Sequence, residues 1–155
     1  MHLKYRFIIL ITCLLVLGFF SCTDKINASQ KLIEDHFKLL NEHNLKELAK
    51  QYSNKVTIVS PDVNSLPGSP KSLLRKYELY FTYCTDVEFK IKEIIVQDSL
   101  VVVQYEIIGS PVKYSPTTTN FYPHGIHDRN CTVFKIKDNK IINEDIYIDD
   151  KYYID

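Results

Sequence analysis

Apolar residues in the first half of this chain mostly follow a helical spacing, whereas those in the second half follow the spacing of β-strands. The first pattern predicts helices at 29–42, 45–52 and 70–83, with one short strand at 56–59. The second pattern predicts four strands in antiparallel succession, at 87–92, 100–108, 129–137 and 140–148. Together these elements predict a single α+β domain.

Turn and breaker residues divide these elements. Asp98-Ser99 and Asp138-Asn139 predict two hairpin turns, and the segments 60–70 and 109–128 predict loops because they are rich in proline, glycine and serine. The run at 100–108 is almost continuously apolar, which is typical of a strand covered on both faces.

Residues 1–21 have the parts of a bacterial export signal. Two cationic residues precede fourteen mostly apolar ones, and Ser21 stands directly before Cys22. That apolar run is shorter than the roughly 20 residues that span a bilayer. We therefore expect a lipoprotein signal, with palmitate-type acyl chains on Cys22. An ordinary secretory signal and an uncleaved anchor are the alternatives.

This interpretation gives three segments: the signal over 1–21, a tether over 22–28 with lipidated Cys22, and a domain over 29–155. Two or more acyl chains anchor a protein stably to a membrane. Thr23 stands where an aspartate would retain an enteric lipoprotein in the inner membrane, so we expect a lipid-anchored envelope protein of the outer membrane.

Removal of the signal changes the charge and the cysteine count. The full chain has 19 basic and 19 acidic residues, and the signal contains Lys4 and Arg6 but no acid, which leaves a formal charge of −2. Such a chain lacks the basic face that nucleic acid requires. Cys84 and Cys131 remain, and two buried free thiols are favoured over a disulfide bridge.

Several short patterns resemble the nuclear transport factor 2-like superfamily, in particular its SnoaL-like branch. They are the apolar stripe from Leu32 to Leu40, the segment from Asn44 to Tyr52, and the ending Asn139-Lys140-Ile141 with Tyr147-x-Asp149. The resemblance covers about 29–150. It implies a cone-shaped curved antiparallel sheet wrapped around a long N-terminal helix, three helices, and a pocket between sheet and helix.

The superfamily contains isomerases, cyclases, epoxide hydrolases, dehydratases and non-catalytic binding domains, so the fold does not define the function. The resemblance places an isomerase's base at Ser60, its oxyanion acid near Thr132 and its tyrosine at His36 or Phe37. It places a cyclase's acid at Ile146, beside Asp145. A serine hydroxyl cannot accept a proton without a base of its own. We therefore expect a domain that binds a small apolar ligand without catalysis, or that forms a homodimer through its sheet.

The resemblance implies that five residues with polar tips face the cone interior as ligand-binding candidates: His36, Tyr52, Tyr105, Thr132 and Tyr147. The alternative is that each packs in the core with its polar group satisfied. A second function class remains open, an isomerase, cyclase or dehydratase with a rearranged acid/base set drawn from His36, Tyr105 and Asp145.

We expect no cofactor and no metal. His124, His127 and Asp128 have a spacing that could bind zinc, but they lie in the predicted loop and lack a fourth ligand. The acidic run at Glu144-Asp145 and Asp149-Asp150 is interpreted as a solvated strand edge.

Overall fold

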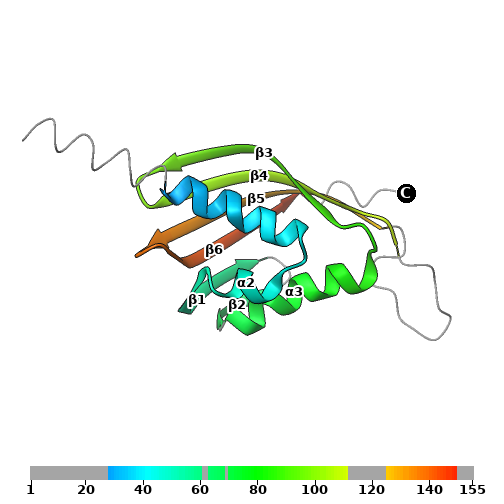
Figure 1. Ribbon diagram of the computed structural model, residues 1–155, viewed down its shortest axis with the longest axis horizontal. Coiled ribbons are helices and arrows are strands. Elements are labelled where there is room, and N and C mark those ends of the chain that lie inside the picture. Colours follow the sequence, from blue (N-terminus) through cyan, green and yellow to red (C-terminus); the bar gives the residue numbers. More distant parts are fainter. Residues whose placement is uncertain (1–27, 61–62, 69, 112–124, 150–155) are drawn as a thin grey trace, which may run out of the picture.

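The computed structural model describes residues 28–60, 63–68, 70–111 and 125–149. A curved six-stranded sheet wraps around the N-terminal helix, and two further helices lie beside it (Figure 1). This arrangement confirms the predicted α+β cone. The predicted signal over 1–21, Cys22 and the tether as far as residue 27 lie outside the described residues.

The helices follow the apolar spacing of the sequence. The N-terminal helix covers residues 28–41, α2 covers Leu45–Ala49 and α3 covers Pro70–Tyr83. Ile33, Phe37 and Leu40 are buried along one side of the N-terminal helix, as their spacing predicts. The second helix was predicted to reach Tyr52 but ends at Ala49, because Tyr52 begins a strand.

The strands form a single sheet with the order β2-β1-β6-β5-β4-β3. Their bounds are Tyr52–Ser60 for β1, Val63–Gly68 for β2, Glu88–Gln97 for β3, Leu100–Gly109 for β4, Ile126–Lys137 for β5 and Lys140–Asp149 for β6. The four C-terminal strands are antiparallel in succession, as predicted. β1 joins them through a parallel pairing with β6.

Strand β2 lies in the segment that the sequence indicated as a loop. It pairs antiparallel with β1, opposite Val56 to Ser60, and forms one edge of the sheet. Pro67 fits an edge strand, where one side of the backbone needs no ladder partner. The sequence did not indicate this strand, because its proline, glycine and serine residues favour turns. The strand forms by pairing with the edge of β1.

The helices leave one face of the sheet with little cover. Along β4, Val101, Val103 and Tyr105 are buried on the inner face, while Gln104 on the outer face is exposed. The prediction that this strand is covered on both faces is therefore wrong within this chain, because the N-terminal helix packs on the inner face alone (Figure 1).

Both hairpin turns are where the sequence placed them. Asp138 and Asn139 have φ values of 50° and 56°, the left-handed conformation that a two-residue turn between twisted strands requires. Of the predicted loop at 109–128, residues 112–124 are not described, and β5 begins at Ile126 rather than at Arg129. None of the described helices combines the length and apolar character that crossing a bilayer would need.

Candidate functional site

Glu144 is a fully buried carboxyl group on the inner face of the sheet. It lies on β6 between Phe134 of β5 and Ile58 of β1. The register of β6 shifts near Asn143, and this irregularity sets which residues of the strand face inward. The interpretation of Glu144 as part of a solvated strand edge is therefore wrong.

Two tyrosines bind the carboxylate from different elements. Tyr52 at the start of β1 donates its hydroxyl to Glu144 Oε2 at 2.7 Å, and Tyr77 of α3 donates to Oε1 at 3.1 Å. Both rings are buried. The carboxylate thus links helix α3 to two strands, and each of its oxygens has a hydrogen bond.

His36 extends this network toward the N-terminal helix. Its Nδ1 lies 3.0 Å from Gln51 Oε1, which can only accept, so this nitrogen carries the proton. Its Nε2 lies 3.5 Å from the Tyr52 hydroxyl. We call Glu144, Tyr52, Tyr77, His36 and Gln51 the Glu144 cluster.

Burial governs the ionisation of the cluster. It raises the pKa of Glu144, and the hydrogen bonds from Tyr52 and Tyr77 offset this only in part. It lowers the pKa of His36 to about 4, against the opposing hydrogen bond to Gln51. Burial, and then the charge of Glu144, raise the pKa of both tyrosines. At neutral pH His36 is therefore uncharged, and Glu144 holds a proton more readily than an exposed glutamate does.

A second polar group lies on the same face. The Tyr105 hydroxyl is 3.1 Å from Thr132 Oγ1, and both side chains are buried. Asn130 lies directly opposite Tyr105 on the neighbouring strand, is 6% exposed, and its Oδ1 has no hydrogen-bond partner. We call Tyr105, Thr132 and Asn130 the inner polar patch.

The structure thus places four of the five predicted ligand-binding residues inside the cone: His36, Tyr52, Tyr105 and Thr132. Tyr147 is a correction, because its side chain is 59% exposed and lies on the outer face. Asp145 is half-buried on the face opposite to Glu144 and Ile146, so it does not join His36 in an acid/base set.

The acid/base positions implied by the family resemblance hold other groups. Ser60 is buried and accepts a hydrogen bond from Lys76 Nζ at 3.1 Å. Ile146 is buried directly opposite Thr132, which belongs to the inner polar patch. No carboxylate occupies any of the three.

Sequence reasoning missed Glu144, Tyr77 and Asn130 as functional candidates. A usable signal existed for Glu144, because a strand that turns Ile146 inward also turns inward the residue two positions earlier. The same argument from Thr132 would have found Asn130. Tyr77 is buried on α3, and its partner Glu144 lies 67 residues away in the sequence, so no local pattern connects the two.

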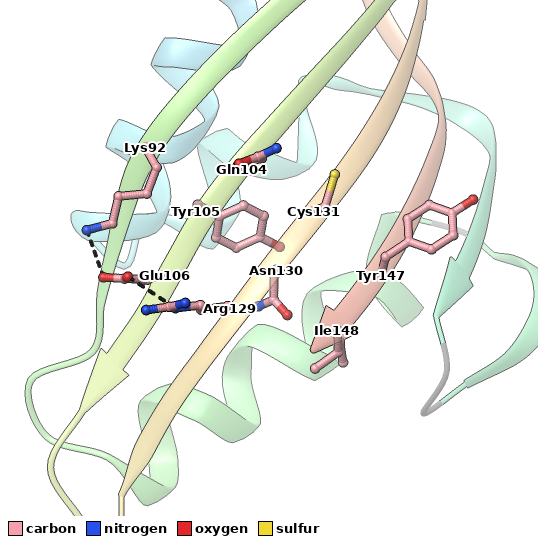
Figure 2. A pocket seen from close by; sticks show the side chains of 9 residues that line it. All are labelled: Lys92, Gln104, Tyr105, Glu106, Arg129, Asn130, Cys131, Tyr147 and Ile148. Atoms are coloured by element: carbon pink, nitrogen blue, oxygen red, sulfur yellow. Dashed lines mark ion pairs between the residues drawn. The ribbon is translucent and has the colours of Figure 1, made fainter. Parts of the chain in front are cut away.

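The outer face of the sheet carries a hollow of about 540 Å³ (Figure 2). Glu106 lies between two cations there, 2.8 Å from Lys92 Nζ and 3.7 Å from Arg129 Nε. The hydrogen bond from Lys92 lowers the pKa of Glu106. Tyr147 and Cys131 line the same hollow. Its ion pairs satisfy one another and do not converge on one point.

Cysteine and metal chemistry add no site to the described part of the chain. Cys84 is free and buried, and Cys131 is free and half-buried. Across residues 28–60, 63–68, 70–111 and 125–149, no three histidine, cysteine, aspartate or glutamate side chains converge as metal ligands would. His124 lies outside these ranges.

Comparison with known proteins agrees with this geometry. The model of the SnoaL-like domain family matches residues 33–144, and the chain therefore belongs to that family. No curated protein matches the chain.

Solved structures share its fold at low sequence identity. AclR from Streptomyces galilaeus is 13% identical over 81% of each chain, with a TM-score of 0.68. Bal32a from a soil-derived mobile gene cassette is 11% identical, with a TM-score of 0.65 over 83% of this chain and 94% of its own. An LEH-like epoxide hydrolase from M. tuberculosis is 12% identical, with a TM-score of 0.63 over 80% and 84%.

Proposed function

We propose that this chain is a lipoprotein of the bacterial outer membrane, held by acyl chains on Cys22, whose SnoaL-like domain binds a small apolar molecule without transforming it. The anchor is supported by the sequence pattern of residues 1–22. The binding function is supported by the composition of the cone interior. There, a few buried polar groups lie among apolar side chains, which is the composition of sites that orient small ligands.

One observation carries the binding function. Asn130 Oδ1 is buried and accepts no hydrogen bond, although folded proteins pair nearly all such atoms. An unpaired buried acceptor costs about 1–3 kcal/mol. A ligand that donates a hydrogen bond to this oxygen would recover that free energy. Without the ligand, the unpaired oxygen destabilises the fold by that amount.

The absence of catalysis is supported by the residue types at the acid/base positions. Ser60, Thr132 and Ile146 stand where related enzymes need carboxylates. The buried carboxyl that is present, Glu144, has each oxygen engaged by a tyrosine. A general base must reach a substrate proton within hydrogen-bonding distance.

Native mass spectrometry of the full-length protein, produced in a bacterial host and released in mild detergent, tests both parts together. We expect a covalent mass increase from acylation and a non-covalent adduct that dissociates on activation. The variant Cys22→Ser should lose the covalent increase alone, and Asn130→Leu should lose the adduct alone. Tyr147→Phe, on the outer face, is the matched control and should keep both.

Two results would contradict the proposal. A wild-type protein without any non-covalent adduct removes the binding function, and an unmodified Cys22 removes the anchor. Density-gradient separation of the membranes tests the location, which is wrong if the protein sediments with the inner membrane.

The outer face of the sheet supports a homodimer. Ile95, Val102 and Val133 lie in register across β3, β4 and β5, and all three point away from the helices. Ile95 is 50% exposed, although it is a large apolar side chain. A second copy of the chain would bury this row and supply the cover that the sequence of β4 predicts.

Glu144 favours a second candidate, an enzyme of the isomerase, cyclase or dehydratase type. A buried carboxyl group whose pKa is raised by desolvation is a candidate for proton transfer. Glu144→Gln separates the two functions. A binding protein should keep its adduct unchanged in this variant, whereas an enzyme should accumulate substrate in place of product in the same spectrum.

A further inference from the structure

The N-terminal helix begins at the end of the cone where the β3–β4 and β5–β6 hairpins turn (Figure 1). Early in the helix, the Leu32 carbonyl accepts a hydrogen bond from Gln51 Nε2, and the Gln51 carbonyl accepts one from the backbone of Ile141 beside the second turn. Late in the helix, Asn41 bonds the backbone of Phe89 near the opposite end of β3. The chain that follows Cys22 therefore enters the domain at the end with the two turns, which we call the hairpin end.

Four exposed lysines gather at the hairpin end. Lys135 and Lys137 lie in the last turnward residues of β5, and Lys140 begins β6. Lys137 and Lys140 are direct partners across the turn. Lys55 lies on β1 directly after Asn54, which lines a surface hollow together with Lys140. We call these four lysines the lysine cluster.

The lysine cluster differs from other lysines in its ion pairing. Within the described ranges its four members form no ion pair, whereas five other lysines are each paired with a carboxylate. Those five are Lys31, Lys38, Lys50, Lys90 and Lys92. Asp98 and Asp138, in the two turns, offset part of the positive charge. The cluster still exceeds these two acids in charge, so this part of the surface favours an anionic partner.

Chain lengths decide which surface of the domain the proposed anchor holds near a bilayer. Residues 23–27 separate Cys22 from the helix, and a segment of this length extends over about 20 Å at most. Strand β3 has 10 residues, which span about 33 Å, so its far end lies well beyond the hairpin end. The attraction of a charged surface fades over about 8 Å at physiological ionic strength. The hairpin end is therefore the surface that the anchor holds closest to the headgroups.

We propose that the lysine cluster binds the anionic phospholipid headgroups of the membrane that holds the acyl chains on Cys22. This inference rests on the proposed anchor and adds an electrostatic contact to it. Clusters of about four to eight cations beside a membrane attachment bind anionic lipid in this way. The contact orients the cone, because it holds the hairpin end at the bilayer and directs the opposite end, where Asp86 bonds Ser110, away from it.

Lysine footprinting tests the contact in the acylated protein. The protein, purified from its bacterial host, is placed in nanodiscs of zwitterionic phosphatidylcholine and in nanodiscs that also contain anionic phosphatidylglycerol. Acetylation by an uncharged N-hydroxysuccinimide ester, followed by peptide mass spectrometry, gives a reaction rate at each lysine. We expect the lysine cluster to react at least about threefold more slowly in the anionic nanodiscs. Lys90, near the opposite end of β3, should react equally in both.

Charge substitutions assign the protection to the cluster. Lys135→Gln combined with Lys137→Gln removes half of the cluster's charge, so its other two members should react at equal rates in the two kinds of nanodisc. Lys38→Gln combined with Lys90→Gln removes the same charge elsewhere and should keep the protection. All four substituted positions are exposed, so both variants should fold, which circular dichroism checks.

Salt provides a further measurement on the wild-type protein. At about 1 M salt, screening limits the attraction to about 3 Å, so the difference between the nanodiscs should disappear. Equal rates in the two nanodiscs, protection that persists in high salt, or protection that survives the double substitution in β5 would each overturn the lipid contact. None of these results affects the anchor, which the acyl mass on Cys22 reports independently. An unmodified Cys22 removes the anchor and the lipid contact together.

Discussion

At the scale of single residues, the buried carboxyl of Glu144 is one source of pH dependence that the structure indicates. A group whose pKa is raised in the folded state stabilises the fold fully below its unfolded value, and this contribution is lost as the pH rises through the folded value. The ordinary value for glutamate is 4.5. Stability from Glu144 should therefore decline as the pH rises above that value.

Glu144→Gln should remove this decline, because an amide resembles the protonated carboxyl and does not ionise. We expect the variant to gain stability relative to wild type as the pH rises from 4.5, measured by urea unfolding followed by circular dichroism. Glu93→Gln, at an exposed position of β3, is the control and should not change the slope. A wild-type-to-variant difference that is constant with pH would contradict the burial argument.

His36 should have the opposite effect on stability, which it lowers as the pH falls. Its pKa falls from 6.5 to about 4 on folding, so its contribution is complete above pH 6.5 and is lost as the pH falls through 4. The shift corresponds to about 3 kcal/mol. His36→Phe should flatten the acid limb of the stability profile, whereas His43→Gln, at an exposed position, should not. Equal acid sensitivity in His36→Phe and wild type would show that another group controls unfolding.

At the scale of elements, the Glu144 cluster fastens α3 to the sheet. Tyr77 provides the hydrogen bond from the helix, and Glu144 receives it on β6. Helix α3 also contacts α2, β1 and β2, and its Tyr77 and Phe81 rings lie against the Phe89 ring on β3. The hydrogen bond from Tyr77 adds a polar link between this helix and β6.

Tyr77→Phe should weaken that link at a cost of about 1–3 kcal/mol, since it leaves one carboxylate oxygen unpaired. Hydrogen exchange should become faster in α3 and stay unchanged in the β3–β4 hairpin. Glu78→Gln, on the exposed side of the same helix, is the matched control. Uniform acceleration across the sheet would mean that the cluster supports the whole fold instead of this helix.

The strands show which structural features the local sequence pattern predicts and which it does not. The two hairpin turns were predicted from their residues. The inward orientation of Glu144 was not predicted, although it follows from that of Ile146 two positions later. Alternation counted from Ile141 does not give it, because the register of β6 shifts near Asn143. Strand β2 was missed because its residues favour turns and its pairing depends on the edge of β1.

At the scale of the whole molecule, the outer face of the sheet is the surface of the proposed homodimer. The row formed by Ile95, Val102 and Val133 is apolar, whereas the nearby hollow contains the Lys92–Glu106–Arg129 ion pairs (Figure 2). An apolar row beside charged groups is the usual composition of an interface with a polar rim.

Val133→Lys should abolish the proposed homodimer, because it places a charge in the middle of this row. Sedimentation velocity of the protein in detergent, corrected for bound detergent, should show a monomer for this variant and a dimer for wild type. Lys135→Ala, at an exposed position of the same strand, is the control and should remain dimeric. A monomeric wild type would contradict the homodimer and leave the ligand site unaffected.

The sequence by itself determined the order of the helices and of every described strand except β2, the two hairpin turns, the family resemblance and the residues buried along the N-terminal helix. These features depend on the spacing of apolar and turn-forming residues along the chain, because the periodicity of a helix or strand determines which of its side chains share a face. Tertiary structure alone decided that β1 runs parallel to β6, that Glu144 is enclosed by two tyrosines, that Tyr147 faces outward and that Asn130 Oδ1 lacks a hydrogen-bond partner. Each of these depends on which backbone lies beside another, and that choice is made by packing between segments far apart in the chain.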